Sequence, residues 1–303
     1  MLSNIIVGLD CGATHTKVVV WKNEEIVFEV DNWPGFNMDL IIGGPGFEEF
    51  NKKIVTLNIF ENADWLIAMA GLDDEDEEKE AQIWWQRDLT ALGIKYKKIK
   101  VISDIELVLW AGSPNGVGVG IIAGTGSNCL ARDENGRTIK VGGMSHLLSD
   151  EGSGFALGWR CLRLVTKMSD GRLPKTKLYK EVLDLYGKKN IVDIKNLLVS
   201  SKEMKYEIAR SAQVLLSAAE NEDYAAEEAV DQESLELVLM INTANRMISP
   251  IKILDVFAAG SLFKNEYYFD RLKENLRSSY PDQKIKVVRP IIGVLNYFKH
   301  FDL

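Results

Sequence analysis

The sequence of 303 residues contains little cysteine and little histidine, three residues of each. The cysteines, Cys11, Cys129 and Cys161, are scattered and lack the Cys-x-x-Cys spacing that is typical of zinc knuckles and redox dithiols. Their odd number argues against a disulfide framework. Three histidines also leave little for a His-rich metal site. These shortages disfavour zinc hydrolases and thiol enzymes.

Long apolar runs are missing too, and none approaches the roughly 20 residues that span a bilayer. The first residues show no basic segment followed by an apolar stretch and a cleavage site, so we expect no export signal, a cytoplasmic protein and no membrane partner. Basic residues are also fewer than acidic ones. The 36 basic and 44 acidic side chains give a net charge of −8, so we expect no nucleic-acid partner, which would need a basic face.

The remaining composition, 46% hydrophobic and 26% charged residues, is typical of a folded globular protein. At about 100–200 residues per domain, the length predicts two domains. Short β-branched runs joined by polar turns predict an opening antiparallel meander, after which helices and strands alternate. The expected strands are 5–9, 18–21, 26–30, 63–70 and 100–103, and the expected helices are 47–60, 76–93 and 105–110. This order predicts a mixed sheet covered by helices.

The opening pattern of strand, Gly/Thr turn, strand, polar turn and strand recurs at 116–123, 128–131 and 138–141. The repeat predicts two related domains, residues 1–112 and 113–290, with the C-terminal segment 291–303 packing back onto the first. The later elements expected are helices 155–168, 177–186 and 193–247 with a break near 220–223, strand 253–258, helix 263–278, strand 285–288 and helix 293–298.

The turn after the first expected strand, Asp10-Cys11-Gly12-Ala13-Thr14-His15-Thr16-Lys17, is the first chemical candidate. Successive amides in such a turn form a nest for phosphate oxygens, and Thr14, Thr16 and Lys17 add hydroxyls and a positive charge. Asp10 is suited to hold Mg²⁺ through water. A hairpin turn capped by Asp10 explains the same residues equally well. No Gly-x-x-x-x-Gly-Lys-Ser/Thr string occurs, which excludes a P-loop NTPase.

The turn Gly124-Thr125-Gly126-Ser127 stands at the equivalent place in the second half. Two turns rich in glycine and hydroxyls at matching positions could hold a polyphosphate from two sides, although a second simple hairpin remains the alternative.

Three acidic residues next to expected strand and helix ends are further candidates. Asp104 follows strand 100–103, at the carboxyl end where α/β sheets place ligands, and precedes a helix. It can act as a general base or cap the helix, and the local pattern alone favours the cap. Asp150 and Glu151 lie in a glycine-rich loop, where they can accept hydrogen bonds from sugar hydroxyls or cap the helix that follows.

Taken together, these strings resemble the BadF/BadG/BcrA/BcrD ATPase family, within the superfamily of sugar kinases, Hsp70 and actin. That family includes N-acetylglucosamine kinases and an archaeal ATP-dependent hexokinase, and the resemblance covers nearly the whole chain. The strings that carry it are Gly8-Leu9-Asp10-Cys11-Gly12-Ala13-Thr14-His15-Thr16-Lys17, Pro34-Gly35-Phe36-Asn37, Ala70-Gly71-Leu72-Asp73, Ser103-Asp104, Ala123-Gly124-Thr125-Gly126-Ser127-Asn128-Cys129, Gly142-Gly143, Leu148-Ser149-Asp150-Glu151-Gly152-Ser153 and Ala259-Gly260-Ser261.

The resemblance implies an α/β fold of two ribonuclease H-like (actin-like ATPase) domains, each a mixed sheet flanked by helices, with an interdomain cleft. It implies transfer of the γ-phosphoryl group of Mg·ATP to a hexose hydroxyl, O6, by a homodimer. Asp104 then matches the catalytic base, which overrides the capping role. The implied ligand contacts are Asp10 for Mg²⁺ through water; Gly12, Thr14, Thr16, Lys17, Gly124, Thr125, Gly126 and Ser127 for phosphate; Gly260 and Ser261 for adenosine; and Asn37, Asp104, Thr125, Gly143 and Asp150 for sugar.

The sequence departs from the family pattern at one informative position. Met144 follows the Gly-Gly pair where N-acetylglucosamine kinases often carry tryptophan, so glucose, glucosamine, N-acetylglucosamine and N-acetylmannosamine all remain candidate acceptors. The alternative activity is an ATPase activator of a partner enzyme, of the type that serves 2-hydroxyacyl-CoA dehydratases and benzoyl-CoA reductases. Such activators carry a cysteine motif for an iron–sulfur cluster, which is not evident here.

Overall fold

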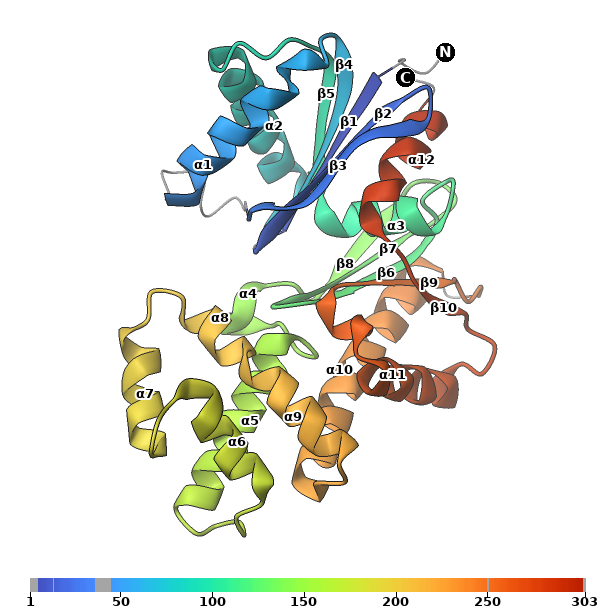
Figure 1. Cartoon of the computed structure of the whole chain (residues 1–303). Helices are drawn as coiled ribbons and strands as arrows, with labels where there is room; N and C mark the ends of the chain where they lie inside the picture. The colour runs from blue at the N-terminus through green and yellow to red at the C-terminus, as the bar shows by residue number, and fades with distance from the viewer. Residues whose placement is uncertain (1–4, 13, 36–44, 250, 302–303) are drawn as a thin grey trace. The chain divides into compact units, whose positions relative to one another are not determined.

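The computed structural model describes residues 5–12, 14–35, 45–249 and 251–301. The chain forms two compact units, one of Met1–Gly120, Arg132–Arg137 and Val288–Leu303 and one of Ile121–Ala131 and Thr138–Val287. Helices and two five-stranded sheets make it an α/β protein (Figure 1). Within the described part of the chain, no helix has both the length and the apolar character to cross a membrane.

The first sheet has the strand order β3-β2-β1-β4-β5. Its strands are β1 (Ile5–Cys11), β2 (His15–Lys22), β3 (Glu25–Pro34), β4 (Ala63–Met69) and β5 (Tyr96–Ser103). β1, β2 and β3 pair antiparallel, which confirms the expected meander, whereas β4 and β5 run parallel to β1. Every residue of β4 is buried, as expected for a central strand with both faces covered.

Helices cover both faces of this sheet because its strand residues alternate between two cores. Val7 and Ile67 pack with Trp85 in the core beneath α1 (Pro45–Ile54), the 3₁₀ helix η2 (Val55–Ile59) and α2 (Glu75–Ala91). Ile6 and Leu66 point the other way. They join the core built by α3 (Asp104–Gly112), the 3₁₀ helix η4 (Pro290–Ile292) and α12 (Gly293–His300).

The second sheet has the order β10-β9-β6-β7-β8 and lies mainly in the second unit. Its strands are β6 (Gly118–Ala123), β7 (Ser127–Arg132), β8 (Thr138–Val141), β9 (Val256–Ala259) and β10 (Ile285–Val287). The helices of this half are α4 (Ser145–Leu148), α5 (Gly154–Ser169), α6 (Lys177–Tyr186), α7 (Ile191–Ser200), α8 (Met204–Ala209), α9 (Ser211–Glu220), α10 (Tyr224–Ile248), the 3₁₀ helix η3 (Ser261–Lys264) and α11 (Glu266–Ser279).

The structure differs from the sequence-based expectation mainly in the helices. The expected helix 47–60 ends at Ile54 and continues as η2. The expected run 193–247 is divided into α7 to α10, since the chain breaks not only at 221–223 but also at 201–203 and at Arg210. Apolar residues continue across these breaks, so hydrophobic periodicity alone does not reveal them. The short helix α4 was not expected from the sequence.

Candidate active-site residues and family membership

The first candidate turn joins β1 and β2 as a tight hairpin. Asp10 pairs with Lys17 and Cys11 with Thr16 across the two strands, and the amide of Gly12 donates to the carbonyl of His15 at 3.1 Å. The Lys17 Nζ lies 3.9 Å from Asp10 Oδ2, and the Asp10 side chain is 14% exposed. Burial raises the pKa of Asp10, and the nearby ammonium of Lys17 partly offsets this effect. The hairpin thus places the acidic side chain of Asp10 next to the basic side chain of Lys17.

The two threonines of this turn have different surroundings. Thr14 is exposed at the hairpin end, whereas Thr16 is fully buried and its hydroxyl donates to the carbonyl of Pro34 at 2.8 Å. Thr16 therefore ties the turn to the end of β3. Two residues of the sequence-based site, Ala13 within the turn and the sugar-binding candidate Asn37, lie outside the described residues.

Asp104 lies at the same sheet edge as the first turn. Cys11, Met69 and Ser103 are in register across the parallel strands β1, β4 and β5. Neighbouring strands lie about 4.8 Å apart, so the backbones of Cys11 and Ser103 are separated by roughly 10 Å. Asp104 is the first residue of α3, and the N-cap position belongs to Ser103. The local sequence pattern favoured Asp104 as the N-cap of this helix, but Ser103 occupies the N-cap position instead.

Glu78 of α2 supports the junction between β5 and α3. Its Oε1 accepts the backbone N–H of Ser103 at 3.0 Å. Burial, and secondarily the nearby carboxylate of Glu106, raise the pKa of Glu78. Glu106 itself pairs with Arg132 at 3.0 Å. Glu78 stands in an acidic stretch of the sequence at the start of α2, and nothing in that stretch reveals this role, because only the tertiary fold brings Glu78 to Ser103.

The second candidate turn is bound to the start of α5. The amides of Gly154 and Phe155 donate to the carbonyls of Gly124 and Thr125 at 2.8 and 3.1 Å. Ser127 is engaged on both sides: its amide donates to Asp150 Oδ1 at 3.1 Å and its hydroxyl to the carbonyl of Glu151 at 2.7 Å. The turn, the helix start and the acidic loop therefore form one connected structure.

Asp150 is almost fully buried, at 3% exposure, and has a left-handed backbone with φ of 72°. The ammonium of Lys205, on α8, pairs with its Oδ2 at 2.7 Å. A Cβ on Gly126 would lie 2.8 Å from Asp150 Oδ1 and 3.1 Å from Lys205 Nζ, so a side chain at this position would have to displace the ion pair. Lys205 was not a candidate from the sequence, since no motif surrounds it.

The loop that carries Asp150 is held from two helices through Gly152. Glu233 of α10 accepts the Gly152 amide at 2.6 Å, and the hydroxyl of Tyr268 on α11 donates to the Gly152 carbonyl at 2.8 Å. Arg160 of α5 pairs with the buried Glu233. Both backbone polar groups of Gly152 are thereby satisfied by buried side chains, which fixes the loop.

The other predicted glycines flank the second turn. Gly260 directly follows β9 and has a φ of 115°. It lies so close to the end of β6 that a Cβ there would be 2.2 Å from the carbonyl oxygen of Ala123. Ser261 Oγ is 3.9 Å from the Cβ position of Gly124. Gly143 lies against Asn128, whose buried Oδ1 has no hydrogen-bond donor within the described residues. An acceptor of that kind suits a hydroxyl group of a ligand.

Within the described ranges, no three histidine, cysteine or acidic side chains are grouped closely enough to hold a metal ion. The carboxylate of Asp10 is a hard oxygen donor at a partly exposed strand end, which fits Mg²⁺ held through water. The three cysteines are buried free thiols, and burial raises the pKa of each. Such thiols are poor metal ligands and poor nucleophiles.

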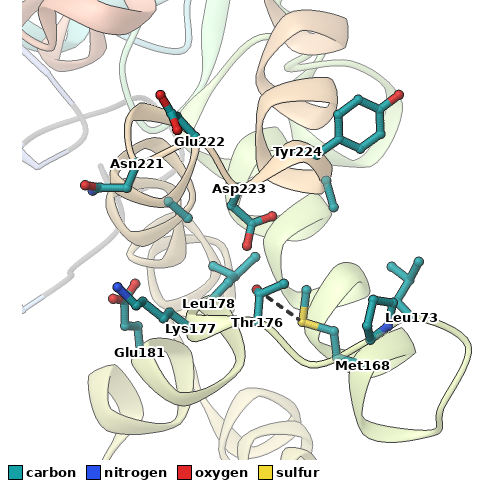
Figure 2. A pocket seen from close by; sticks show the side chains of 13 residues that line it. Met168, Leu173, Thr176, Lys177, Leu178, Glu181, Asn221, Glu222, Asp223 and Tyr224 are labelled. Carbon is teal, nitrogen blue, oxygen red and sulfur yellow. Dashed lines mark hydrogen bonds between the residues drawn. The ribbon is translucent and has the colours of Figure 1, made fainter.

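A separate cavity of about 670 Å³ lies among the helices of the second unit (Figure 2). Figure 2 shows side chains from the start of α6 and from the connection between α9 and α10 around it, among them Lys177, Asp223 and Tyr224. None of the residues that the sequence singled out lines this cavity.

Two proteins with similar sequences are kinases by name. The N-acetylmuramic acid/N-acetylglucosamine kinase of Clostridium acetobutylicum is 32% identical over 190 residues, which make up 62% of this chain and 62% of that protein. The N-acetyl-D-glucosamine kinase of Dictyostelium discoideum is 25% identical over 252 residues, or 78% of this chain and 73% of that protein.

Solved structures agree on the fold. A candidate N-acetylglucosamine kinase from Chromobacterium violaceum matches with a TM-score of 0.74 at 20% identity, over 96% of this chain and 98% of that one. A ROK-family glucokinase from Streptomyces griseus matches with a TM-score of 0.58 at 14% identity, over 97% and 98%. The two sheets flanked by helices therefore form an actin-like ATPase fold. The BadF/BadG/BcrA/BcrD ATPase family model matches residues 7–293, and the chain belongs to that family.

Proposed function

We propose that this protein is an ATP-dependent sugar kinase that phosphorylates a hydroxyl of an amino sugar of the N-acetylglucosamine type. The observation that carries the proposal is the common edge of the first sheet. There the Asp10–Lys17 hairpin and Asp104 end two strands that are separated by one further strand. This arrangement supports the proposal because one sheet holds both a turn that could bind phosphate and a carboxylate that could act as general base. The names of both curated relatives support an amino-sugar acceptor.

In this mechanism Asp104 accepts the proton of the attacking sugar hydroxyl. Its position at the start of a helix after a buried strand keeps the carboxylate fixed, and Glu78 fixes the backbone that precedes it. The hairpin amides, with Thr14 and Lys17, bind phosphate oxygens, and Asp10 would hold Mg²⁺ through water. Magnesium would supply charge stabilisation to the transferring phosphoryl group. In such reactions positioning and electrostatics provide most of the acceleration.

The second unit contributes binding contacts. Gly124, Thr125 and Gly126 supply further phosphate contacts, while Ser127 holds the turn to the Asp150 loop. Gly260 and Ser261, directly beside this turn, bind the adenosine part of the nucleotide. Gly143, Asp150 and the acceptor oxygen of Asn128 contact the sugar hydroxyls. We further propose a homodimer, which size-exclusion chromatography with light scattering would detect.

The decisive experiment measures ATP consumption with glucose, glucosamine, N-acetylglucosamine, N-acetylmannosamine and N-acetylmuramic acid, and without sugar. We expect consumption to depend on an amino sugar. Asp104→Asn should lower kcat by about 10²–10⁴-fold with little change in ATP affinity, as expected for loss of a general base. Asp282→Asn, at an exposed loop position, is the matched control and should retain wild-type turnover. Sugar-independent hydrolysis would instead support the activator alternative, and near-normal turnover of Asp104→Asn would remove Asp104 from its role.

A further inference from the structure

The cavity of about 670 Å³ in the second unit has no part in the proposed function. It is lined entirely by helices and connections of that unit, where the start of α6 meets the connection between α9 and α10 (Figure 2). Cavities that hold small organic ligands in proteins measure about 300–1,000 Å³, so this one is large enough for a ligand of its own.

The inner walls of the cavity are apolar. Met168 of α5, Leu178 of α6 and Ala218 of α9 line it, and all three are buried in the packing of the helices. The hydroxyl of Thr176 is directed at the sulfur of Met168, at 3.9 Å, rather than at the backbone of α6. A ligand that covers these walls removes apolar surface from water, which is favourable, so we expect the ligand to have an apolar part.

The charges around the cavity are negative in sum. Three acidic residues and one basic residue line it: Glu181, Glu222, Asp223 and Lys177. Lys175, in the adjoining loop, has its ammonium over the ring of Tyr179 at 4.3 Å, and counting this lysine as well still leaves a net negative charge. A cavity lined by charge of this sign attracts cations and disfavours anions.

Asp223 is the acidic residue whose side chain points into the cavity, and Figure 2 shows its carboxylate turned toward Leu178. As the N-cap of α10 it accepts the Ala226 amide at Oδ1, at 3.2 Å, and within the described ranges no donor to its Oδ2 is found. Burial raises the pKa of the Cys161 thiol, and the carboxylates of Asp223 and Glu181 raise it further. Both carboxylates therefore act on the protein interior beside the cavity, and Asp223 has an oxygen available to a ligand.

We propose that this cavity is a binding site for a small organic monocation, a primary ammonium group joined to an apolar body. The apolar body packs against Met168 and Leu178, and the ammonium donates a charge-assisted hydrogen bond to the Oδ2 of Asp223. Glu181 and Glu222 add attraction at longer range. The site is independent of the proposed function, since binding there requires neither ATP nor sugar.

The test uses 2-phenylethylamine as the probe and the methyl group of Met168 as the reporter. The full chain has eight methionines, and after ¹³C-methyl methionine labelling the NMR resonance of Met168 is assigned as the one that Met168→Leu removes. We expect 2-phenylethylamine to shift this resonance saturably with a Kd of about 1 mM, ordinary for so small a ligand. The neutral 2-phenylethanol should bind about 10-fold more weakly, and the anion phenylacetate should cause no saturable shift. Met69, in a core of the first unit, is the internal control and should not respond.

Asp223→Asn is the decisive variant, because asparagine caps a helix about as well as aspartate and α10 should keep its start. It should weaken binding of the amine about 10-fold and leave that of 2-phenylethanol unchanged, as expected for loss of one partly exposed, charge-assisted hydrogen bond. Lys177→Gln removes a positive charge from the lining and should strengthen binding of the amine about 2–3-fold. Glu220→Gln, at an exposed position outside the lining, is the matched control and should change the affinities less than either variant.

Equal affinities for the amine and the alcohol would overturn the assignment, because the cavity would then select only for apolar character. An unchanged affinity of Asp223→Asn for the amine would overturn it too. The same holds if the amine shifts other methionines but not Met168, or causes no saturable shift up to its solubility limit. Each of these outcomes leaves the proposed function standing, since sugar-dependent ATP consumption is measured separately.

Discussion

Removal of a single hydroxyl tests whether the Asp150 loop is held from α11. The Tyr268 hydroxyl donates to the carbonyl of Gly152 at 2.8 Å, and the Tyr268 side chain is fully buried. Burial and the nearby Glu233 raise the pKa of Tyr268 well above its ordinary value, so the phenol stays a neutral donor at working pH. Tyr268→Phe keeps the ring and its packing but leaves the Gly152 carbonyl without this donor.

The expected cost follows from the environment of that carbonyl. A buried acceptor left unsatisfied costs about 1–3 kcal/mol of unfolding free energy. For a folding unit of this size, each kcal/mol lowers Tm by about 2–4 °C. We therefore expect Tm to fall by roughly 2–12 °C. Because Gly152 adjoins Glu151 and Asp150, we also expect KM for the sugar to rise more than KM for ATP.

Thermal unfolding followed by circular dichroism, together with steady-state kinetics, would measure both effects. Tyr224→Phe is the matched control: it removes the same atom from a tyrosine that is 77% exposed, so Tm should move by less than about 1 °C. A Tyr268→Phe protein with the Tm and sugar KM of the wild type would refute the idea that this hydroxyl holds the loop.

Two further substitutions test the supports of Asp104 and Lys205. Glu78→Gln should raise Tm at about pH 7 but not at about pH 4. Burial raises the native pKa of Glu78 above its ordinary value of 4.5, so its charge costs stability only once the pH exceeds that range, and glutamine can still accept the Ser103 amide. An equal effect at both pH values would contradict this reasoning. Gly158→Ala should destabilise the protein by about 1–3 kcal/mol in urea unfolding, because the added Cβ meets the Ile208 carbonyl at 2.0 Å. Gly171→Ala, with open space around it and only a positive φ against it, should cost less, and equal losses would show that helix contact is not the cause.

The sheets and their ends could be predicted from the sequence. Short β-branched runs, polar turns and alternation with helices located all five strands of the first sheet, and the position of Asp104 after a strand placed it at a carboxyl end. These features are local, since strand propensity and turn chemistry act over a few residues. The two turns could also be identified from their glycines and hydroxyls, and the family resemblance then assigned their roles and added Gly260. The cleft and the domain limits 1–112 and 113–290 stay predictions.

The supports of the site could not be predicted, because each depends on contacts between residues far apart in the sequence. Glu233 of α10 and Tyr268 of α11 both hydrogen-bond to the backbone of Gly152. The sequence around each of them predicts only an ordinary helix. Glu78 has the composition of a solvated helix start, yet it binds Ser103. A charged or aromatic side chain reveals such a role only when the fold shows which backbone group it satisfies.

This contrast separates two parts of the proposed activity, phosphoryl transfer and sugar binding. Asp10 and Asp104 are set by strand register, which a buried sheet specifies strongly, since a slip of one residue would turn its side chains to the wrong face. The Lys205 partner of Asp150 is set instead by the six-residue helix α8, which packs against Gly158 of α5 and accepts the Tyr186 hydroxyl at the carbonyl of Glu207. Substitutions in α8 should therefore change KM for the sugar, while substitutions at the sheet edge should change whether phosphoryl transfer occurs at all. Measuring kcat separately from KM for the sugar in both sets of variants would distinguish the two effects.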